Sequence, residues 1–160
     1  MMKLSRDMAR RFLLYHQGLL GEARFLGPEG LMAFVRQAGC VQFDPVDVCG
    51  RSPELVFLAR VPDYRAEMLE DLLYRGRRLV DYFDKNLAIL PSEDWPYFRR
   101  ARERYASDSR SFEQIGRVRG TVLEKIRLDG PQDSSQLGLP EKVDWYWSRT
   151  TLARAVLEQL

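Results

Sequence analysis

The stretch PQDSSQLGLPEKVDWYWSRTTLARAVLEQL, residues 131–160, decides the fold class that we expect for this chain. Residues 131–138 are short enough for two helical turns, residues 139–147 read as an extended link, and a final helix is predicted from Ser148. The preceding residues 112–130 carry apolar side chains at a three-to-four spacing and predict a longer helix. Helix, turn, short helix, link and helix together are the outline of a winged helix-turn-helix.

The outline stops before a wing is reached. A winged helix needs a β-hairpin after its last helix, but the sequence ends at Leu160 on an apolar position. We therefore expect residues 107–160 to be the start of a second winged helix whose wing is missing. The short polar segment 107–111 predicts the joint, and residues 1–106 a first winged-helix-like unit with additional helices. The predicted fold class is mainly α with short β-strands, arranged as tandem winged helix-turn-helix units with the second truncated.

Local signals place the elements of the first unit. Ser5 is a helix N-cap, and a second helix is expected from Pro28 to Gly39, residue types that favour helix starts and ends. Two short helices follow over residues 53–61 and 65–76, and residues 77–91 predict a strand or hairpin. Residues 92–106 predict one amphipathic helix with Trp95 and Tyr105 on its apolar stripe. We expect the aromatic side chains at 144–147 to pack in the core against the last helix.

The composition bounds the class of protein. With 160 residues, 45% of them hydrophobic, the chain can fill a core, and a net charge of +2 excludes wholesale electrostatic attraction to nucleic acid. Cys40 and Cys49 fit neither a zinc pattern nor a disulfide scaffold, and we expect both as packed free thiols. The sequence has neither a signal peptide nor a transmembrane run, which predicts a soluble cytoplasmic protein without a membrane partner.

Residues 40–48, CVQFDPVDV, hold the best candidate for chemistry. In an extended segment side chains alternate, so Gln42 and Asp44 share one face while Phe43 points the other way. A carboxylate beside an amide can orient water or stabilise a sugar cation as a base leaves. The alternative is structural, because Asp before Pro45 is a common turn former. Spacing alone leaves both interpretations open.

Other catalytic classes lack partners in this sequence. The lone histidine, His16, lies among apolar residues of the first helix, where we expect a structural role. There is no G-x-S-x-G, no His/Cys cluster and no phosphate-binding glycine loop, so neither a metal site nor a cofactor is predicted.

Local charge indicates nucleic acid more strongly than the total does. Residues 95–127 contain nine arginines and lysines against four acids, and residues 74–78, YRGRR, form a second basic cluster. Such groups contact phosphates, but compensated pairs on a solvated helix face explain the first cluster equally well. We predict phosphate contacts from four arginines, Arg77, Arg78, Arg99 and Arg100. We predict a recognition-helix surface from three residues near the end of the chain, Arg149, Thr150 and Arg154.

Four stretches resemble the bacterial tandem winged-helix DNA glycosylases of the AlkZ and YcaQ group. They are QGLLG at 17–21, GLMAFVRQAGCVQFDPVDVCGRS at 30–52, LLYRGRRLVDYFDKNLAILPSEDWPYFRR at 72–100 and VDWYWSRTTLARAVLEQL at 143–160. The family's signature is glutamine, an apolar residue, then glutamine or aspartate. Gln42, Phe43 and Asp44 match the aspartate version, which is similar to the crosslink-unhooking branch.

The resemblance implies the N-terminal part of a DNA repair glycosylase that hydrolyses the N-glycosidic bond of alkylated or interstrand-crosslinked purines. It implies that Asp44 activates water or supports the sugar cation and that Gln42 positions water or DNA. It also implies double-stranded DNA as partner, a nucleoid-associated location in a bacterium, and no metal or redox cofactor. The oligomeric state is not set by the sequence. The alternative is a non-catalytic winged-helix DNA-binding or regulatory protein.

One segment departs from the family pattern. Many members have tryptophan and histidine where this chain has Phe83 and Lys85. A histidine-dependent step is therefore not carried over, and Lys85 is a candidate phosphate contact, with an ordinary surface lysine as the alternative.

Overall fold

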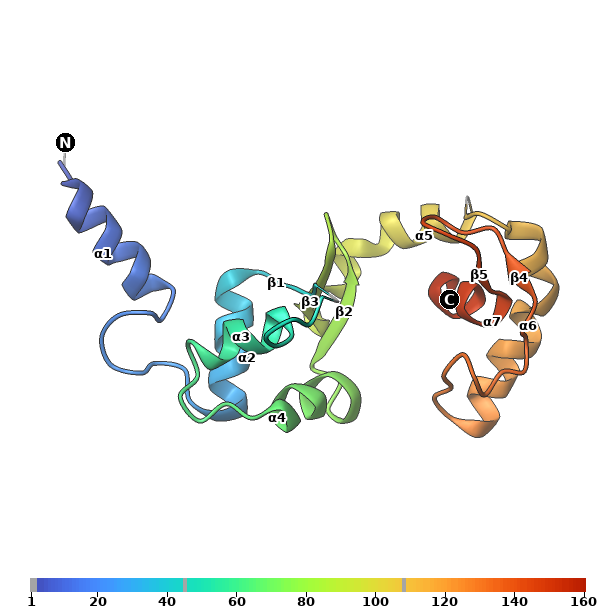
Figure 1. Ribbon diagram of the computed structural model, residues 1–160, viewed down its shortest axis with the longest axis horizontal. Coiled ribbons are helices and arrows are strands. Elements are labelled where there is room, and N and C mark those ends of the chain that lie inside the picture. Colours follow the sequence, from blue (N-terminus) through green and yellow to red (C-terminus); the bar gives the residue numbers. More distant parts are fainter. Residues whose placement is uncertain (1–2, 45, 108) are drawn as a thin grey trace. The chain divides into compact units, whose positions relative to one another are not determined.

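The structure is a computed structural model that describes residues 3–44, 46–107 and 109–160 (Figure 1). Contacts divide the chain into two compact units, Met1–Pro96 and Tyr97–Leu160, and each is described by itself. Helices make up most of the regular structure, which confirms the mainly α class with short β-strands. The domain boundary after residue 106 stays a prediction, and Asp108 of the predicted joint lies outside the described residues.

In the first unit, two helices precede the first strand of a small antiparallel sheet, and further helices separate that strand from the hairpin formed by the other two (Figure 1). The sheet has the order β1-β3-β2, so β3 lies between its two neighbours. The two short helices and the hairpin predicted over residues 53–91 are confirmed, and a π-helical turn, η1, continues α4. The elements are α1 (Arg6–His16), α2 (Gly27–Ala38), β1 (Val41–Gln42), α3 (Ser52–Leu58), α4 (Ala66–Glu70), η1 (Asp71–Arg75), β2 (Leu79–Phe83) and β3 (Leu87–Pro91).

Capping residues set the ends of the first two helices as predicted. The Ser5 hydroxyl accepts a hydrogen bond from the Met8 N–H over 3.1 Å and caps α1. Pro28 lies in the first turn of α2, and Gly39 ends that helix with a φ of 82°, a left-handed conformation that glycine adopts without strain.

The core of the first unit forms around α2. Leu31 and Val35 are fully buried, and Phe34 meets the rings of Phe25 and Phe57 edge to face. α1 contributes no buried residue and presents several large apolar side chains to solvent. The remaining core side chains come from α2, α4, η1, the sheet and the loop between α3 and α4: Met32, Val41, Val61, Tyr64, Met68, Leu69, Leu72, Leu79 and Ile89.

The helix predicted over residues 92–106 is divided in two. Residues Ser92–Phe98 form a 3-10 helix, η2, and the α-helix α5 runs only over Arg99–Ser107. Pro96 lies inside η2, where its ring and missing N–H oppose a regular α-helix. The prediction of one continuous amphipathic helix is therefore wrong.

In the second unit, the long helix α6 (Phe112–Asp129) packs against the last helix α7 (Leu152–Gln159), and α7 also contacts a two-stranded sheet (Figure 1). Its strands are β4 (Lys142–Val143) and β5 (Thr150–Thr151), paired antiparallel. Two predictions are wrong: residues 131–138 form turns instead of a helix, and the last helix begins at Leu152 instead of Ser148. Thr150 and Thr151 are β-branched and pair as a strand, after which the Thr151 hydroxyl caps α7 by accepting from the Arg154 N–H.

The second core packs α6 against α7 and the link between them. Trp145 is 6% exposed, which confirms core packing there, whereas Trp147 is 95% exposed and that part of the prediction is wrong. The Trp145 indole Nε1 donates a hydrogen bond to Glu158 over 2.6 Å, which ties the link to α7. The buried members of this core are Ile115, Val122, Val143, Trp145, Leu152, Ala155 and Val156.

No described helix combines the length and the apolar character needed to cross a membrane.

Candidate functional site

The glutamine of the candidate motif ends a strand that is tied to the middle of the sheet. β1 pairs antiparallel with β3, with Gln42 opposite Ala88, and the Phe43 N–H donates to the Leu87 carbonyl over 2.8 Å. Phe43 is partly buried and packs against the core, while Gln42 is exposed. The alternation that we expected for Gln42 and Phe43 is therefore present.

The two carboxylate oxygens of Asp44 have different surroundings. Oδ1 accepts a hydrogen bond from the Val46 N–H over 2.9 Å, an Asx-type turn. Oδ2 has no hydrogen-bond partner among the residues that the structure describes. Asp44 itself is half-buried, and Pro45, on which the turn interpretation also rests, lies outside the described residues. One oxygen thus holds the turn, and the other is available to a ligand or water.

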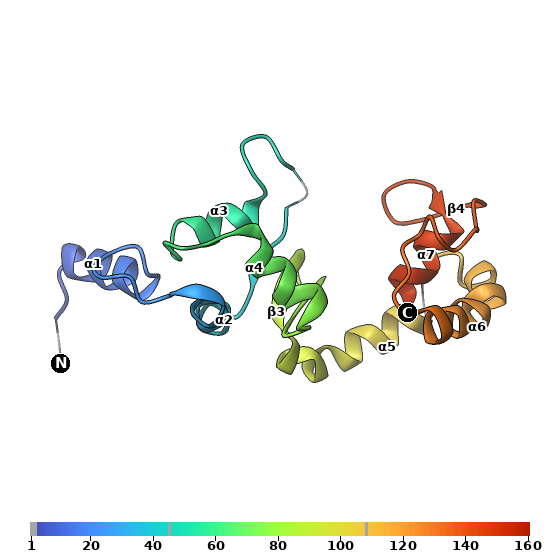
Figure 2. The ribbon, with the colours of Figure 1, turned by 90° about the horizontal axis from the view of Figure 1, so that it is seen from below.

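Ser52, at the start of α3, contacts the motif from across a loop. Its hydroxyl donates to the Gln42 carbonyl over 2.9 Å and accepts from the Asp44 N–H over 3.3 Å. Residues 46–51 between them project from the unit before the chain returns to α3 (Figure 2). Cys49 lies in this loop and Cys40 precedes β1; both are free and exposed, so the expectation that they are packed is wrong.

Arg77 and Arg78, the predicted phosphate contacts of the first unit, differ in their pairing. Arg77 is exposed, adopts a φ of 50°, and has no charged partner in the described parts of the chain. Arg78 instead forms a two-pronged ion pair with Glu29 of α2, one prong measuring 2.8 Å. Lys85 is exposed in the turn between β2 and β3, with no ion pair to a described residue. Arg77 and Lys85 are thus available to a phosphate, whereas the charge of Arg78 is already compensated.

A second two-pronged ion pair lies on the same helix. Arg36 of α2 donates to both carboxylate oxygens of Glu93 in η2, over 2.8 and 2.9 Å. Hydrogen bonding to the guanidinium lowers the pKa of the Glu93 carboxyl, and Arg78 lowers the pKa of Glu29 in the same way. These two pairs join residues 57 and 49 positions apart, so no local sequence signal indicates them.

Of the predicted DNA contacts on α5, one arginine is paired. The Arg99 Nε donates to Glu103 over 2.7 Å, one turn along the helix, which is the compensated arrangement that the sequence also allowed. Arg100 is exposed and has no ion pair with a described residue.

The three residues predicted for the recognition-helix surface are not together on one helix. Arg149 precedes β5 and donates to the Lys142 carbonyl over 2.9 Å, and Thr150 lies in β5 opposite Val143. Arg154 alone lies on α7, where its Nε donates to Glu158 over 2.6 Å. The expected helical surface is wrong for Arg149 and Thr150, because the last helix begins after them.

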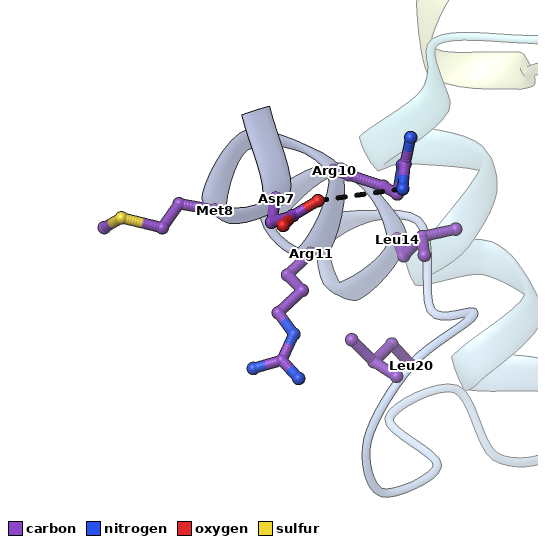
Figure 3. Close-up of a pocket in the computed structure, with 6 residues that line it drawn as sticks. All are labelled: Asp7, Met8, Arg10, Arg11, Leu14 and Leu20. Atoms are coloured by element: carbon purple, nitrogen blue, oxygen red, sulfur yellow. Dashed lines mark ion pairs between the residues drawn. The ribbon is translucent and has the colours of Figure 1, made fainter. Parts of the chain in front are cut away.

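A pocket lies on α1 and the loop that follows it, and no residue of the motif lines it (Figure 3). Asp7 and Arg10 form an ion pair of 3.7 Å there, while Met8 and Arg11 point outward (Figure 3). His16, at the end of α1, is exposed and stacks on Phe12. Nowhere in the described residues do three or more His, Cys, Asp or Glu side chains cluster so as to hold a metal ion. The pocket lining is Asp7, Met8, Arg10, Arg11, Leu14 and Leu20.

Comparison with known proteins identifies the family. No solved structure matches the chain. Residues 35–160, well over half of the sequence, match a family described as DNA glycosylase AlkZ-like, and this range includes Gln42, Asp44 and Ser52. The chain therefore belongs to the AlkZ-like DNA glycosylase family.

Proposed function

We propose that this protein hydrolyses the N-glycosidic bond of alkylated or interstrand-crosslinked purines in double-stranded DNA, with Asp44 and Gln42 as its catalytic residues. The observation that carries the proposal is the extended segment at the end of β1, within the family match. Phe43 packs on the core, Gln42 is exposed, and Asp44 keeps one carboxylate oxygen without a partner among the described residues.

The proposed hydrolysis needs few catalytic groups besides these two side chains. A purine alkylated at N7 carries a positive charge, so it leaves with the bonding electrons without needing a strong general acid. The Asp44 carboxylate is proposed to accept a proton from the attacking water, or to stabilise the positive charge that develops on the sugar. The Gln42 amide is proposed to orient that water. Water oxygen then bonds to the sugar carbon as the bond to the base breaks.

The topology of the first unit supports a DNA-binding role for it. Helix, strand, two helices and a β-hairpin follow one another from α2 to β3, and the first strand adds to the hairpin in the order β1-β3-β2. This order supports a winged helix with α4 as the recognition helix and the β2–β3 turn as the wing. Arg77 follows η1 and Lys85 lies in that turn, so both would meet the DNA backbone in such a complex.

A base-release assay on a duplex that contains N7-alkylguanine tests the proposal. Asp44→Asn removes the charge and is expected to slow single-turnover base release by about 10²- to 10⁴-fold, the usual contribution of a general base. Asp47→Asn is the matched control, because it removes one negative charge from an exposed residue of the same loop. Equal rates for Asp44→Asn and the wild-type protein would remove Asp44 from the mechanism.

The second candidate is a DNA-binding module without catalysis. The Asp44–Val46 hydrogen bond favours it, because a turn-forming aspartate needs no catalytic role. This candidate predicts salt-sensitive duplex binding by the wild-type protein, the same affinity for Asp44→Asn, and no release of the base from either.

A further inference from the structure

Ser52 bridges the backbone on both sides of Phe43. Its Oγ donates to the Gln42 carbonyl oxygen over 2.9 Å and accepts from the Asp44 N–H over 3.3 Å. A hydroxyl group can donate one hydrogen bond while accepting others, so the two bonds form together. A single side chain, ten positions along the chain from Gln42, therefore contacts both ends of the motif.

The two backbone groups that Ser52 contacts lie on the open edge of β1. Among the described strands, β1 has β3 as its neighbour on one side and none on the other. The Phe43 N–H points to β3, where it donates to the Leu87 carbonyl. Successive residues of an extended chain turn their backbone groups to opposite sides, so the Gln42 carbonyl and the Asp44 N–H point away from β3. The Ser52 hydroxyl takes the place of a further strand.

This bridge extends the strand geometry beyond the paired residues. Regular pairing of β1 ends at Gln42, and the following residues 46–49 are exposed. Ser52 on one edge and Leu87 on the other hold the chain extended through Phe43 to Asp44. Side chains two residues apart share a face only while the backbone stays extended. The relative placement of Gln42 and Asp44 thus depends on a residue outside the motif.

We propose that Ser52 is a positioning residue for base excision, which acts by holding the Asp44 carboxylate and the Gln42 amide on one face. The inference rests on the function proposed above. Ser52 acts through the backbone and not on the substrate. A misplacement of about 1 Å at a reacting group costs about 10²-fold in rate, so loss of the bridge affects the chemical step more than DNA binding.

Ser52→Ala and Ser52→Thr test the inference in the same N7-alkylguanine assay. Ser52→Ala is expected to slow single-turnover base release roughly 10- to 100-fold, with unchanged duplex affinity and thermal midpoint. Ser52→Thr keeps a hydroxyl and is expected to restore the rate. Ser111→Ala is the control, because it removes a serine-to-carbonyl hydrogen bond of 2.8 Å, to Asp144, in the second unit.

Amide hydrogen exchange of Asp44, followed by NMR, gives a readout that does not depend on activity. Ser52→Ala removes the acceptor of this N–H, so exchange at Asp44 is expected to accelerate, while Ser52→Thr keeps it slow. The inference is overturned if the Asp44 amide of the Ser52→Ala protein exchanges as slowly as in the wild-type protein. It is also overturned if the Ser52→Ala protein releases the base at the wild-type rate. A rate lost equally in the alanine and threonine variants also overturns it.

The two proposals fail in different ways. A wild-type protein that releases no base overturns the proposed function and, with it, a role for Ser52 in that reaction. An active wild-type protein whose Ser52→Ala variant is equally active overturns only the inference about Ser52.

Discussion

Gly30 and Gly116 offer two glycine-to-alanine substitutions of opposite expected sign. Gly30 lies in the first turns of α2, where an added methyl would sit 2.4 Å from the carbonyl carbon of Phe25 and 2.8 Å from its Cα. Ordinary carbon–carbon contacts are about 3.5–4.0 Å, so α2 and the Phe25 backbone would have to separate by about 1 Å. A side chain could rotate away from this contact, but a backbone segment cannot.

The expected magnitude follows from two opposing effects. Overpacking of a closed site costs about 1–3 kcal/mol, and a contact with backbone lies at the upper end of that range. Alanine gains about 1 kcal/mol over glycine in helix propensity. For Gly30→Ala we therefore expect a net loss of about 2 kcal/mol in the free energy of unfolding.

Gly116 is the matched control. It lies inside α6, where an added Cβ meets no described atom within 4 Å apart from the nearby backbone of its own helix, so Gly116→Ala is expected to gain about 0.5–1 kcal/mol. Urea unfolding followed by circular dichroism measures both changes as shifts of the midpoint. A Gly30→Ala protein as stable as the wild type would refute the close packing of α2 on Phe25, and so would shifts of the same sign in both variants.

Two further predictions concern charged residues of the first unit. Arg77→Ala is expected to weaken duplex binding and to reduce the salt slope of the binding constant by about one, whereas Arg78→Ala, whose partner is Glu29, leaves that slope unchanged. Fluorescence anisotropy at several salt concentrations checks this, and equal slopes for the two variants would contradict it. Ion pairing lowers the pKa values of Glu29 and Glu93 below the ordinary 4.5 in the folded protein, so their charges stabilise the fold above that pH. This contribution is lost as the pH falls through the lowered values, and a Glu29→Gln/Glu93→Gln protein is expected to lose less stability on acidification below pH 4.5, measured by urea unfolding.

The sequence predicted correctly those helices whose first and last residues depend on nearby capping residues. Pro28 and Gly39 bound α2 because a proline in the first turn and a glycine after the last one act within a few residues. The same reasoning failed from Ser148, where β-branched Thr150 and Thr151 pair with residues 142–143 before α7 begins. It also missed the effect of Pro96 inside an otherwise helical pattern.

In the candidate site, too, local features were predicted from the sequence and long-range contacts were not. Alternation along an extended segment predicted that Phe43 packs inward while Gln42 stays exposed, because the pleat of a strand has a period of two residues. The partners of the charged and polar groups come from distant parts of the chain. Ser52 on the motif backbone and Glu29 on Arg78 are contacts that only the folded arrangement brings together.

Asp44 joins two roles that one substitution can separate. Its Oδ1 holds a turn by accepting from the Val46 N–H, and an asparagine carbonyl oxygen can accept the same hydrogen bond. Asp44→Asn therefore keeps the turn and removes only the charge, whereas Asp44→Ala removes both. If Asp44 serves the turn alone, the asparagine variant matches the wild type in stability and in DNA binding, and only the alanine variant is destabilised. If the carboxylate takes part in base excision, both variants lose base release while the asparagine variant keeps its unfolding midpoint.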